Sequence, residues 1–85
     1  MGRQILVFIK RDCPRCPEAK VLAERLRKKG QMVSQFDIGT VDGLAEASFY
    51  GVMATPTKII VDGDEALLAA WRGVVPAGNE LFEFL

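Results

Sequence analysis

Residues 4–16 read QILVFIKRDCPRC, and within them an apolar run gives way to a pair of cysteines. The run Gln4–Ile9 is aliphatic and rich in β-branched residues, which is typical of a strand covered on both faces. Apolar residues then recur at three- and four-residue spacing over positions 19–26, as on one face of a helix. We therefore predict that the cysteines lie where a strand ends and a helix begins, with Cys13 at or near the N-cap and Cys16 in the first turn.

The position of the two cysteines favours redox chemistry. The thiolate is the nucleophile in disulfide exchange, and the unpaired N–H groups of a helix N-terminus favour a thiolate, so we expect Cys13 to be the more acidic thiol. A mixed disulfide formed at Cys13 can be resolved by Cys16, which closes an intramolecular disulfide. Cys13 is the predicted attacking thiol and Cys16 the predicted resolving thiol.

The cysteine pair also allows other interpretations. A purely structural disulfide here closes a short loop and stabilises little, because the stabilisation grows with loop length. A structural zinc ion within one chain needs four ligands, and the chain has two Cys and no His, so no metal ligands are assigned. An iron–sulfur or other metal-binding module, with the Cys thiolates shared between chains, stays open as the alternative. A partner-binding domain without redox activity would leave the helix-start position of the cysteines unexplained.

Composition indicates one small globular domain over residues 1–85. Hydrophobic residues make up 49% of the chain and charged residues 26%, and no apolar run reaches the roughly 20 residues of a membrane span. The N-terminal residues show no secretory signal pattern, so a reducing cytoplasm is the expected location. We expect no membrane partner, and a monomer.

Charge is unevenly distributed, although the formal net charge is zero. Residues 1–30 hold nine Lys or Arg and three Asp or Glu, whereas residues 31–85 hold two and eight. The basic residues gather toward the end of the predicted first helix, where they complement its dipole and face water. Aromatic side chains are not interleaved with them, so we expect no nucleic-acid partner.

The rest of the chain alternates between strand and helix patterns. Pro17 predicts an irregular or late first turn of the first helix, Gly30 is a natural C′ residue, Thr40 a plausible N-cap, and Asp62-Gly63 a tight-turn signal. The predicted elements are strand Gln4–Ile9, a helix from about Pro14 to Lys29, strand Met32–Ile38, helix Leu44–Tyr50, strands Thr57–Val61 and Ala66–Arg72, and helix Pro76–Leu85. This βαβαββα order predicts an α/β fold with a four-stranded mixed sheet, in which the first two strands are parallel, the last two form a hairpin, and helices cover both faces.

At these motifs the chain resembles the thioredoxin and glutaredoxin families. Residues 10–16, KRDCPRC, resemble the glutaredoxin site, with a lysine before a Cys-Pro-x-Cys core. Residues 50–57, YGVMATPT, are similar to the thioredoxin segment that precedes its third strand, and Gly73 and residues 81–85 also look like thioredoxin. The resemblance covers nearly all of the chain. It implies a minimal thioredoxin fold with a redox-active Cys13–Cys16 disulfide.

The resemblance also implies a substrate-binding groove. It implies that the Thr55–Pro56 peptide bond is cis and that the backbone of Thr55 meets an extended substrate. The expected substrate-binding residues are Lys10, Pro14, Arg15, Thr55 and Pro56. Two departures are plain: Asp12 replaces the thioredoxin tryptophan before the first cysteine, and residues 73–75 replace the glutaredoxin Gly-Gly-acid segment that holds glutathione.

We therefore expect a thiol-disulfide oxidoreductase of the protein-disulfide reductase type, an electron-transport protein that acts by dithiol exchange. Its expected substrates are disulfides in proteins or small molecules. No cofactor is expected apart from the redox-active disulfide Cys13–Cys16. A reductase or glutathione is the expected electron donor.

Overall fold

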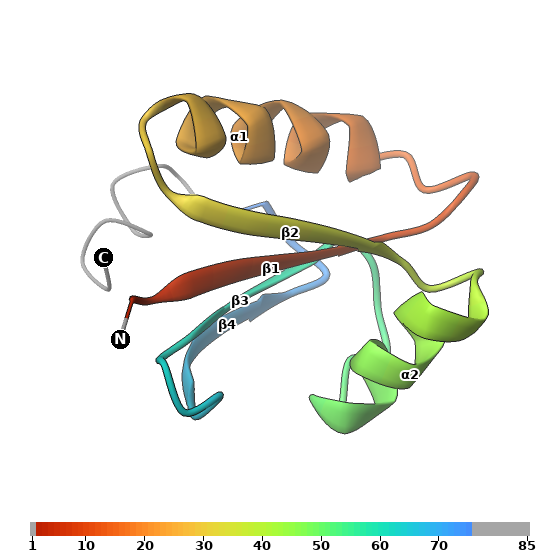
Figure 1. Ribbon diagram of the computed structural model, residues 1–85. Helices are drawn as coiled ribbons and strands as arrows, with labels where there is room; N and C mark the ends of the chain where they lie inside the picture. The colour runs from red at the N-terminus through yellow and green to blue at the C-terminus, as the bar shows by residue number, and fades with distance from the viewer. Residues whose placement is uncertain (1, 76–85) are drawn as a thin grey trace.

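The predicted four-stranded sheet is present, and within residues 2–75 one helix covers each of its faces. The structure is a computed structural model that describes residues 2–75. The elements are β1 (Gln4–Ile9), α1 (Cys16–Lys28), β2 (Met32–Asp37), α2 (Val41–Phe49), β3 (Thr57–Val61) and β4 (Leu67–Arg72) (Figure 1). The strand order is β2-β1-β3-β4, with β2 parallel to β1 and both β3 and β4 antiparallel to their neighbours. The predicted α/β fold is confirmed, whereas the predicted helix Pro76–Leu85 lies outside the described residues.

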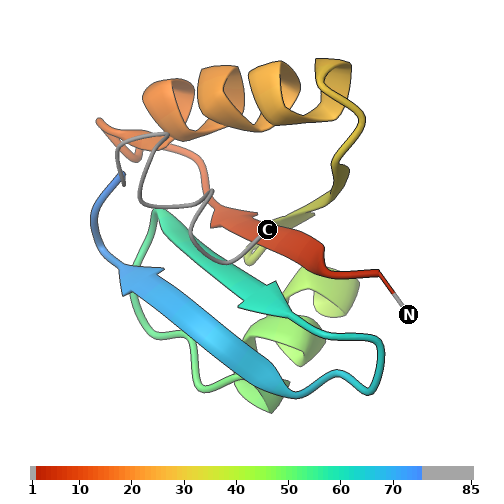
Figure 2. The same ribbon diagram turned by 90° about the vertical axis from the view of Figure 1, so that its left-hand side faces the viewer.

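The two helices cover opposite faces of the sheet (Figures 1 and 2). Side chains alternate along a strand, so β1 sends Ile5, Val7 and Ile9 toward α1 and sends Leu6 and Phe8 toward α2. Every one of these five side chains is buried. Burying an aliphatic or aromatic side chain of this size contributes about 1.5 to 3 kcal/mol, so β1 is the centre of the core on both sides.

The start of α1 differs from the prediction. The helix begins at Cys16, its N-cap is Arg15 rather than Cys13, and no side chain caps it. The reason is Pro17, which then occupies the second helical position, where a missing N–H breaks no intrahelical hydrogen bond. The late first turn and the place of Cys16 within it are as predicted, whereas Cys13 lies in the loop before the helix.

The end of α1 follows the sequence signal at Gly30. This glycine has a φ of +90°, in the left-handed region that a residue with a Cβ rarely adopts. Its N–H donates to the Arg27 carbonyl at 3.0 Å, and the Gln31 N–H donates to the Leu26 carbonyl at 3.1 Å. These two bonds form a Schellman motif, which ends the helix at Lys28 and turns the chain into β2.

The helix α2 begins three residues before the predicted Leu44. Thr40 is its N-cap, as its residue type suggested, because the Thr40 hydroxyl accepts from the Gly43 N–H at 3.0 Å. The same hydroxyl donates to the Asp37 carbonyl at 2.7 Å, which ties the helix start to the end of β2. Gly43 permits this close approach, since a Cβ there would lie 1.9 Å from the Asp37 carbonyl oxygen.

The hairpin between β3 and β4 has a longer loop than the tight turn predicted at Asp62-Gly63. The Asp62 carboxylate accepts from the backbone N–H groups of Asp64 at 2.8 Å and Ala66 at 3.0 Å. Within this loop, Glu65 has a positive φ of 63°. The Asp62 side chain therefore organises a wider loop, and β4 starts at Leu67.

Substituting Gly43 by alanine tests the contact between α2 and the end of β2. Although alanine is the better helix former, Gly43→Ala should lower the free energy of unfolding by about 1 to 3 kcal/mol, because its Cβ meets backbone that must move. Urea denaturation measures the change. Ser48→Ala, at an exposed position of the same helix, is the control and should raise stability by up to about 0.5 kcal/mol. Equal stability of Gly43→Ala and the wild type would contradict the close approach.

Candidate redox site

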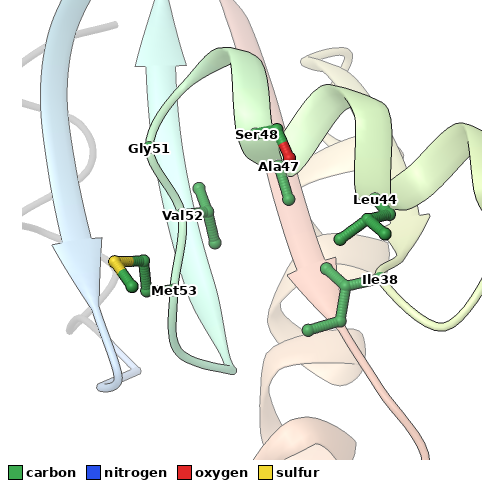
Figure 3. Close-up of a pocket in the computed structure, with 7 residues that line it drawn as sticks. All are labelled: Ile38, Leu44, Ala47, Ser48, Gly51, Val52 and Met53. Carbon is green, nitrogen blue, oxygen red and sulfur yellow. The ribbon is translucent and has the colours of Figure 1, made fainter.

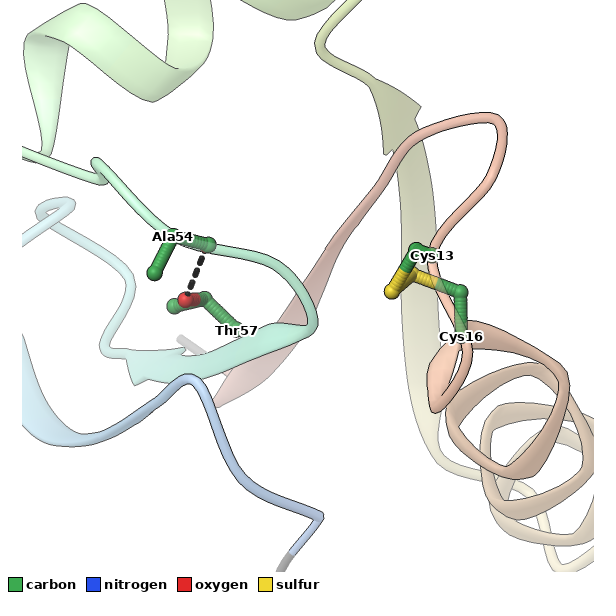
Figure 4. The surroundings of a disulfide bond; sticks show 4 residues. All are labelled: Cys13, Cys16, Ala54 and Thr57. Atoms are coloured by element: carbon green, nitrogen blue, oxygen red, sulfur yellow. Dashed lines mark hydrogen bonds between the residues drawn. A yellow bond between two sulfur atoms is a disulfide. The ribbon is translucent and has the colours of Figure 1, made fainter.

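The two cysteines form a disulfide between the end of β1 and the start of α1. Their Cα atoms are 5.3 Å apart, and the Cys16 N–H donates to the Cys13 carbonyl at 3.3 Å. Cys13 is 8% exposed and Cys16 is 3% exposed, and both belong to the core cluster under α1. Figure 4 shows the disulfide facing the segment that runs from Ala54 to Thr57. The bond is therefore held at the edge of the core, with Cys13 the more accessible partner.

A pocket of about 370 Å³ lies beside the disulfide. It is lined by the loop before α1 and by the segment before β3: Lys10, Asp12, Cys13, Pro14, Met53, Ala54 and Thr55. Cys13 is part of this lining and Cys16 is not. A disulfide in the pocket would therefore meet Cys13 first.

The predicted substrate-binding residues divide into two groups. Lys10, Pro14 and Thr55 line the pocket together with Cys13. Arg15 is exposed at the N-cap of α1 and Pro56 is fully buried, and neither lines the pocket. The Thr55–Pro56 peptide bond is cis.

Backbone contacts fix the segment that forms the far wall of the pocket. The buried Thr57 hydroxyl donates to the Ala54 carbonyl at 2.7 Å (Figure 4). The Gly73 N–H, at the end of β4, donates to the Pro56 carbonyl at 2.8 Å. The segment is thus tied to both strands of the hairpin, which holds Ala54 and Thr55 in place opposite the disulfide.

Two other hollows each share one lining residue with this pocket. An apolar hollow of about 520 Å³ lies between α2 and the segment before β3, and Figure 3 shows Leu44, Val52 and Met53 around it. A third hollow, of about 400 Å³, is lined by polar and charged residues that include Lys10 and Asp37. Met53, 94% exposed, is shared with the apolar hollow, and Lys10 with the polar one.

Sequence reasoning did not assign Met53, Ala54 or Asp12 to the site. Met53 and Ala54 stand beside the assigned Thr55 in the segment YGVMATPT, so their position next to Thr55 was the available signal. Asp12 precedes Cys13 and has a φ of 59°, in the left-handed region. Asp tolerates this conformation better than most residues, and the turn that it makes brings the chain from β1 into the Cys13 loop.

One ionisable group of the core lies on the same face of the sheet as the disulfide. Lys58 of β3 is 1% exposed, and its Nζ donates to the Ala19 carbonyl of α1 at 3.0 Å. Burial disfavours the charged form and lowers the pKa of Lys58 to about 8. Nothing in the sequence pattern distinguished this lysine, since β3 was predicted only from its apolar neighbours.

Metal ligands do not gather within residues 2–75. No group of three or more His, Cys, Asp or Glu side chains in this part of the chain is placed to hold a metal ion. Neither of its helices is long and apolar enough to cross a membrane. The arrangement at Cys13 and Cys16 is that of a dithiol pair and not that of a closed metal site.

A family model described as a thioredoxin domain matches residues 3–85. The chain belongs to the thioredoxin domain family. The predicted thioredoxin-like family is thus confirmed. A relative described as a probable thioredoxin of Archaeoglobus fulgidus is 32% identical over 57 residues, which cover 66% of this chain and 63% of the relative. The match therefore spans less than two thirds of that curated relative.

Solved thioredoxins share the fold of this family member. A mutant thioredoxin from Halobacterium salinarum has a TM-score of 0.81 at 20% identity, and the match covers 98% of this chain and 71% of that one. Thioredoxin-2 of a malaria parasite, described as a component of the protein secretion machinery, has a TM-score of 0.80 at 22% identity, with coverages of 98% and 80%. At these identities the likeness shows the fold alone.

The left-handed conformation of Asp12 makes a test of the loop before Cys13. Asp12→Val should lower the free energy of unfolding of the oxidised protein by about 1 to 2 kcal/mol, because a β-branched residue resists positive φ. Asp12→Asn is the matched control, since it removes the same charge and tolerates the conformation. Urea denaturation of both variants provides the comparison. If valine and asparagine prove equally stable, the conformation of residue 12 does not constrain this loop.

Proposed function

We propose that this thioredoxin-family domain is a thiol-disulfide oxidoreductase that reduces disulfides through Cys13 and Cys16. The proposal rests on the placement of the two cysteines. Cys13 lies in the wall of a pocket, and Cys16 is buried next to it at the first position of α1. A pocket beside one thiol and a second thiol within bonding reach are what dithiol exchange needs.

The steps follow from this placement. In the reduced protein, the Cys13 thiolate attacks a sulfur of the substrate disulfide, and one substrate thiolate leaves. The Cys16 thiolate then attacks the Cys13 sulfur of the mixed disulfide, and the second substrate thiolate leaves. The domain ends as the Cys13–Cys16 disulfide, and the substrate has gained two electrons. A thiol or dithiol donor returns the domain to its reduced form.

The proposed substrate is a disulfide-bearing polypeptide, which makes the domain a protein-disulfide reductase. Lys10, Pro14 and Thr55 line the pocket, and we propose that an extended substrate chain lies along Thr55 and bonds to its backbone. We assign Arg15 and Pro56 supporting roles, Arg15 as an exposed charge near the rim and Pro56 as the buried anchor of the Thr55 wall. The donor is a reductase or glutathione, and the proposed setting is a monomer in the cytoplasm.

No specific observation favours the metal-binding alternative. Within the part of the chain that the structure describes, the two cysteines stand without a third ligand close by. Dithiol exchange through Cys13 and Cys16 is therefore the single function proposed for this domain.

Single cysteine variants test the two roles. Cys13→Ser should abolish reduction of a protein disulfide such as that of insulin. Cys16→Ser should retain the first attack and accumulate a mixed disulfide with the substrate, because no resolving thiol is present. Non-reducing electrophoresis and mass spectrometry detect the trapped species. Equal trapping by both variants would contradict the assignment of Cys13 as attacking thiol.

Arg15 provides a test of partner recognition. Since its side chain is exposed and outside the pocket, Arg15→Ala should leave reduction of an uncharged small disulfide unchanged. For an acidic peptide disulfide it should raise KM by about threefold, in line with the 0.2 to 1 kcal/mol of an exposed ion pair, and salt should shrink the difference. Kinetics at low and high salt measure the effect. A similar loss with both substrates would mean that Arg15 acts on the thiols themselves.

A further inference from the structure

Lys58 enters the same buried layer as the two cysteines. In the ladder it stands opposite Val7 of β1 and Trp71 of β4, and alternation along these strands turns all three toward α1. Its Nζ reaches the Ala19 carbonyl at 3.0 Å, and Ala19 follows Cys16 by three residues on the buried face of α1. The amine of β3 therefore ends about one helical turn from the resolving cysteine.

The surroundings of Lys58 are apolar on each element packed against it. β1 presents Val7 and Ile9, α1 presents Ala19 and Ala23, and β4 presents Trp71. The ionisable side chains of this layer, within residues 2–75, are Lys58 and the two cysteines.

Carboxylates in the described part of the chain lie elsewhere. Glu18 and Glu24 of α1 are exposed, and the carboxylate of Asp37, at the end of β2, accepts from the Gly39 N–H. Burial is the cause of the lowered pKa of Lys58, with no described carboxylate acting against it. A charged Lys58 in the oxidised protein thus lacks a described anionic partner.

We propose that Lys58 is the buried counter-ion of the reduced dithiol, whose ammonium group stabilises the Cys16 thiolate and so speeds the resolving attack. This inference rests on the proposed function and deepens it. Lys58 acts through the thiolate and does not touch the substrate, so it is a positioning residue. Because it is buried, its charge is screened by salt much less than that of Arg15.

The redox balance follows from this pairing. Two electrons and one proton convert the disulfide into a thiolate at Cys13 and a thiol at Cys16, with an external dithiol such as dithiothreitol as the reductant. Cys16 then loses its proton for the resolving attack. The new negative charge favours the ammonium form of Lys58. Above about pH 8, where the amine of the oxidised protein is partly neutral, reduction should therefore take up an additional proton at Lys58.

The first experiment compares Lys58→Met with the wild type, because methionine fills a similar volume without charge. At pH 7 the equilibrium constant for reduction by dithiothreitol should fall by less than about tenfold, that is by less than about 30 mV, because Cys16 is mostly a thiol in the reduced protein. The rate of the resolving step should fall by about tenfold, as for one pKa unit of the Cys16 thiol. The first attack, measured in a Cys16→Ser background, should change by less than about twofold.

Two further variants serve as controls. Lys20→Met removes an exposed lysine from α1 and should leave both the equilibrium and the resolving rate unchanged. Lys58→Arg keeps the charge and should retain most of the resolving rate. A folded Lys58→Met with the wild-type equilibrium constant and resolving rate overturns the proposal.

A second measurement needs no variant. In protein labelled with ¹³C-lysine, the pKa of Lys58 can be followed by NMR in the oxidised and the reduced states. It should rise on reduction, while the pKa values of the exposed lysines stay the same. An equal pKa of Lys58 in both states overturns the proposal, even if Lys58→Met fails to fold. If the domain has no activity on protein disulfides, the proposed function is wrong. The NMR comparison of the Lys58 pKa in the two redox states still tests the role of Lys58.

Discussion

Burial of β1 on both of its faces is the constraint on which the rest of the structure depends. Residues 5–9 are each at most 9% exposed, so each face of the strand needs its own cover. The helix α1 provides one cover and α2 the other (Figure 1). Since α1 must return over the sheet directly after β1, the chain between them is forced into a short loop at the end of the strand. Both cysteines are in or next to this loop, which makes their position a consequence of the core.

The site is assembled from two segments that are far apart in the sequence. The loop before α1 supplies Cys13, and the segment before β3 supplies Thr55 on the opposite wall. The bond from the Thr57 hydroxyl to Ala54 and the bond from Gly73 to Pro56 anchor the second segment to the hairpin. The sheet order, in which β1 and β3 are neighbours, brings the two segments together. The pocket is thus a property of the sheet and not of either segment alone.

Lys58 is the polar exception in an otherwise apolar layer. An amine taken out of water destabilises the fold in its charged form unless it is paired, and the Ala19 carbonyl provides a single hydrogen bond. A methionine of similar volume would fill the same space without this cost. A buried lysine at this position has a function if its charge is balanced whenever the dithiol is reduced. The ammonium group of Lys58 is then unfavourable in the oxidised protein and favourable in the reduced protein.

Local chemistry in the sequence determined much of this protein. The apolar run of β1, the cysteine pair at the strand–helix joint, the C′ role of Gly30 and the capping role of Thr40 all depend on residues within one or two turns, so they could be predicted. Where local signals compete, prediction was less accurate: Pro17 moved the N-cap from Cys13 to Arg15, and the Asp62 carboxylate widened the hairpin loop.

Only the tertiary structure decided which distant residues meet. Met53 joins Cys13 at one pocket because β1 and β3 are paired, and Lys58 reaches a carbonyl 39 residues away because α1 lies over that face of the sheet. No periodicity or spacing encodes such contacts, since they arise from the way whole elements pack.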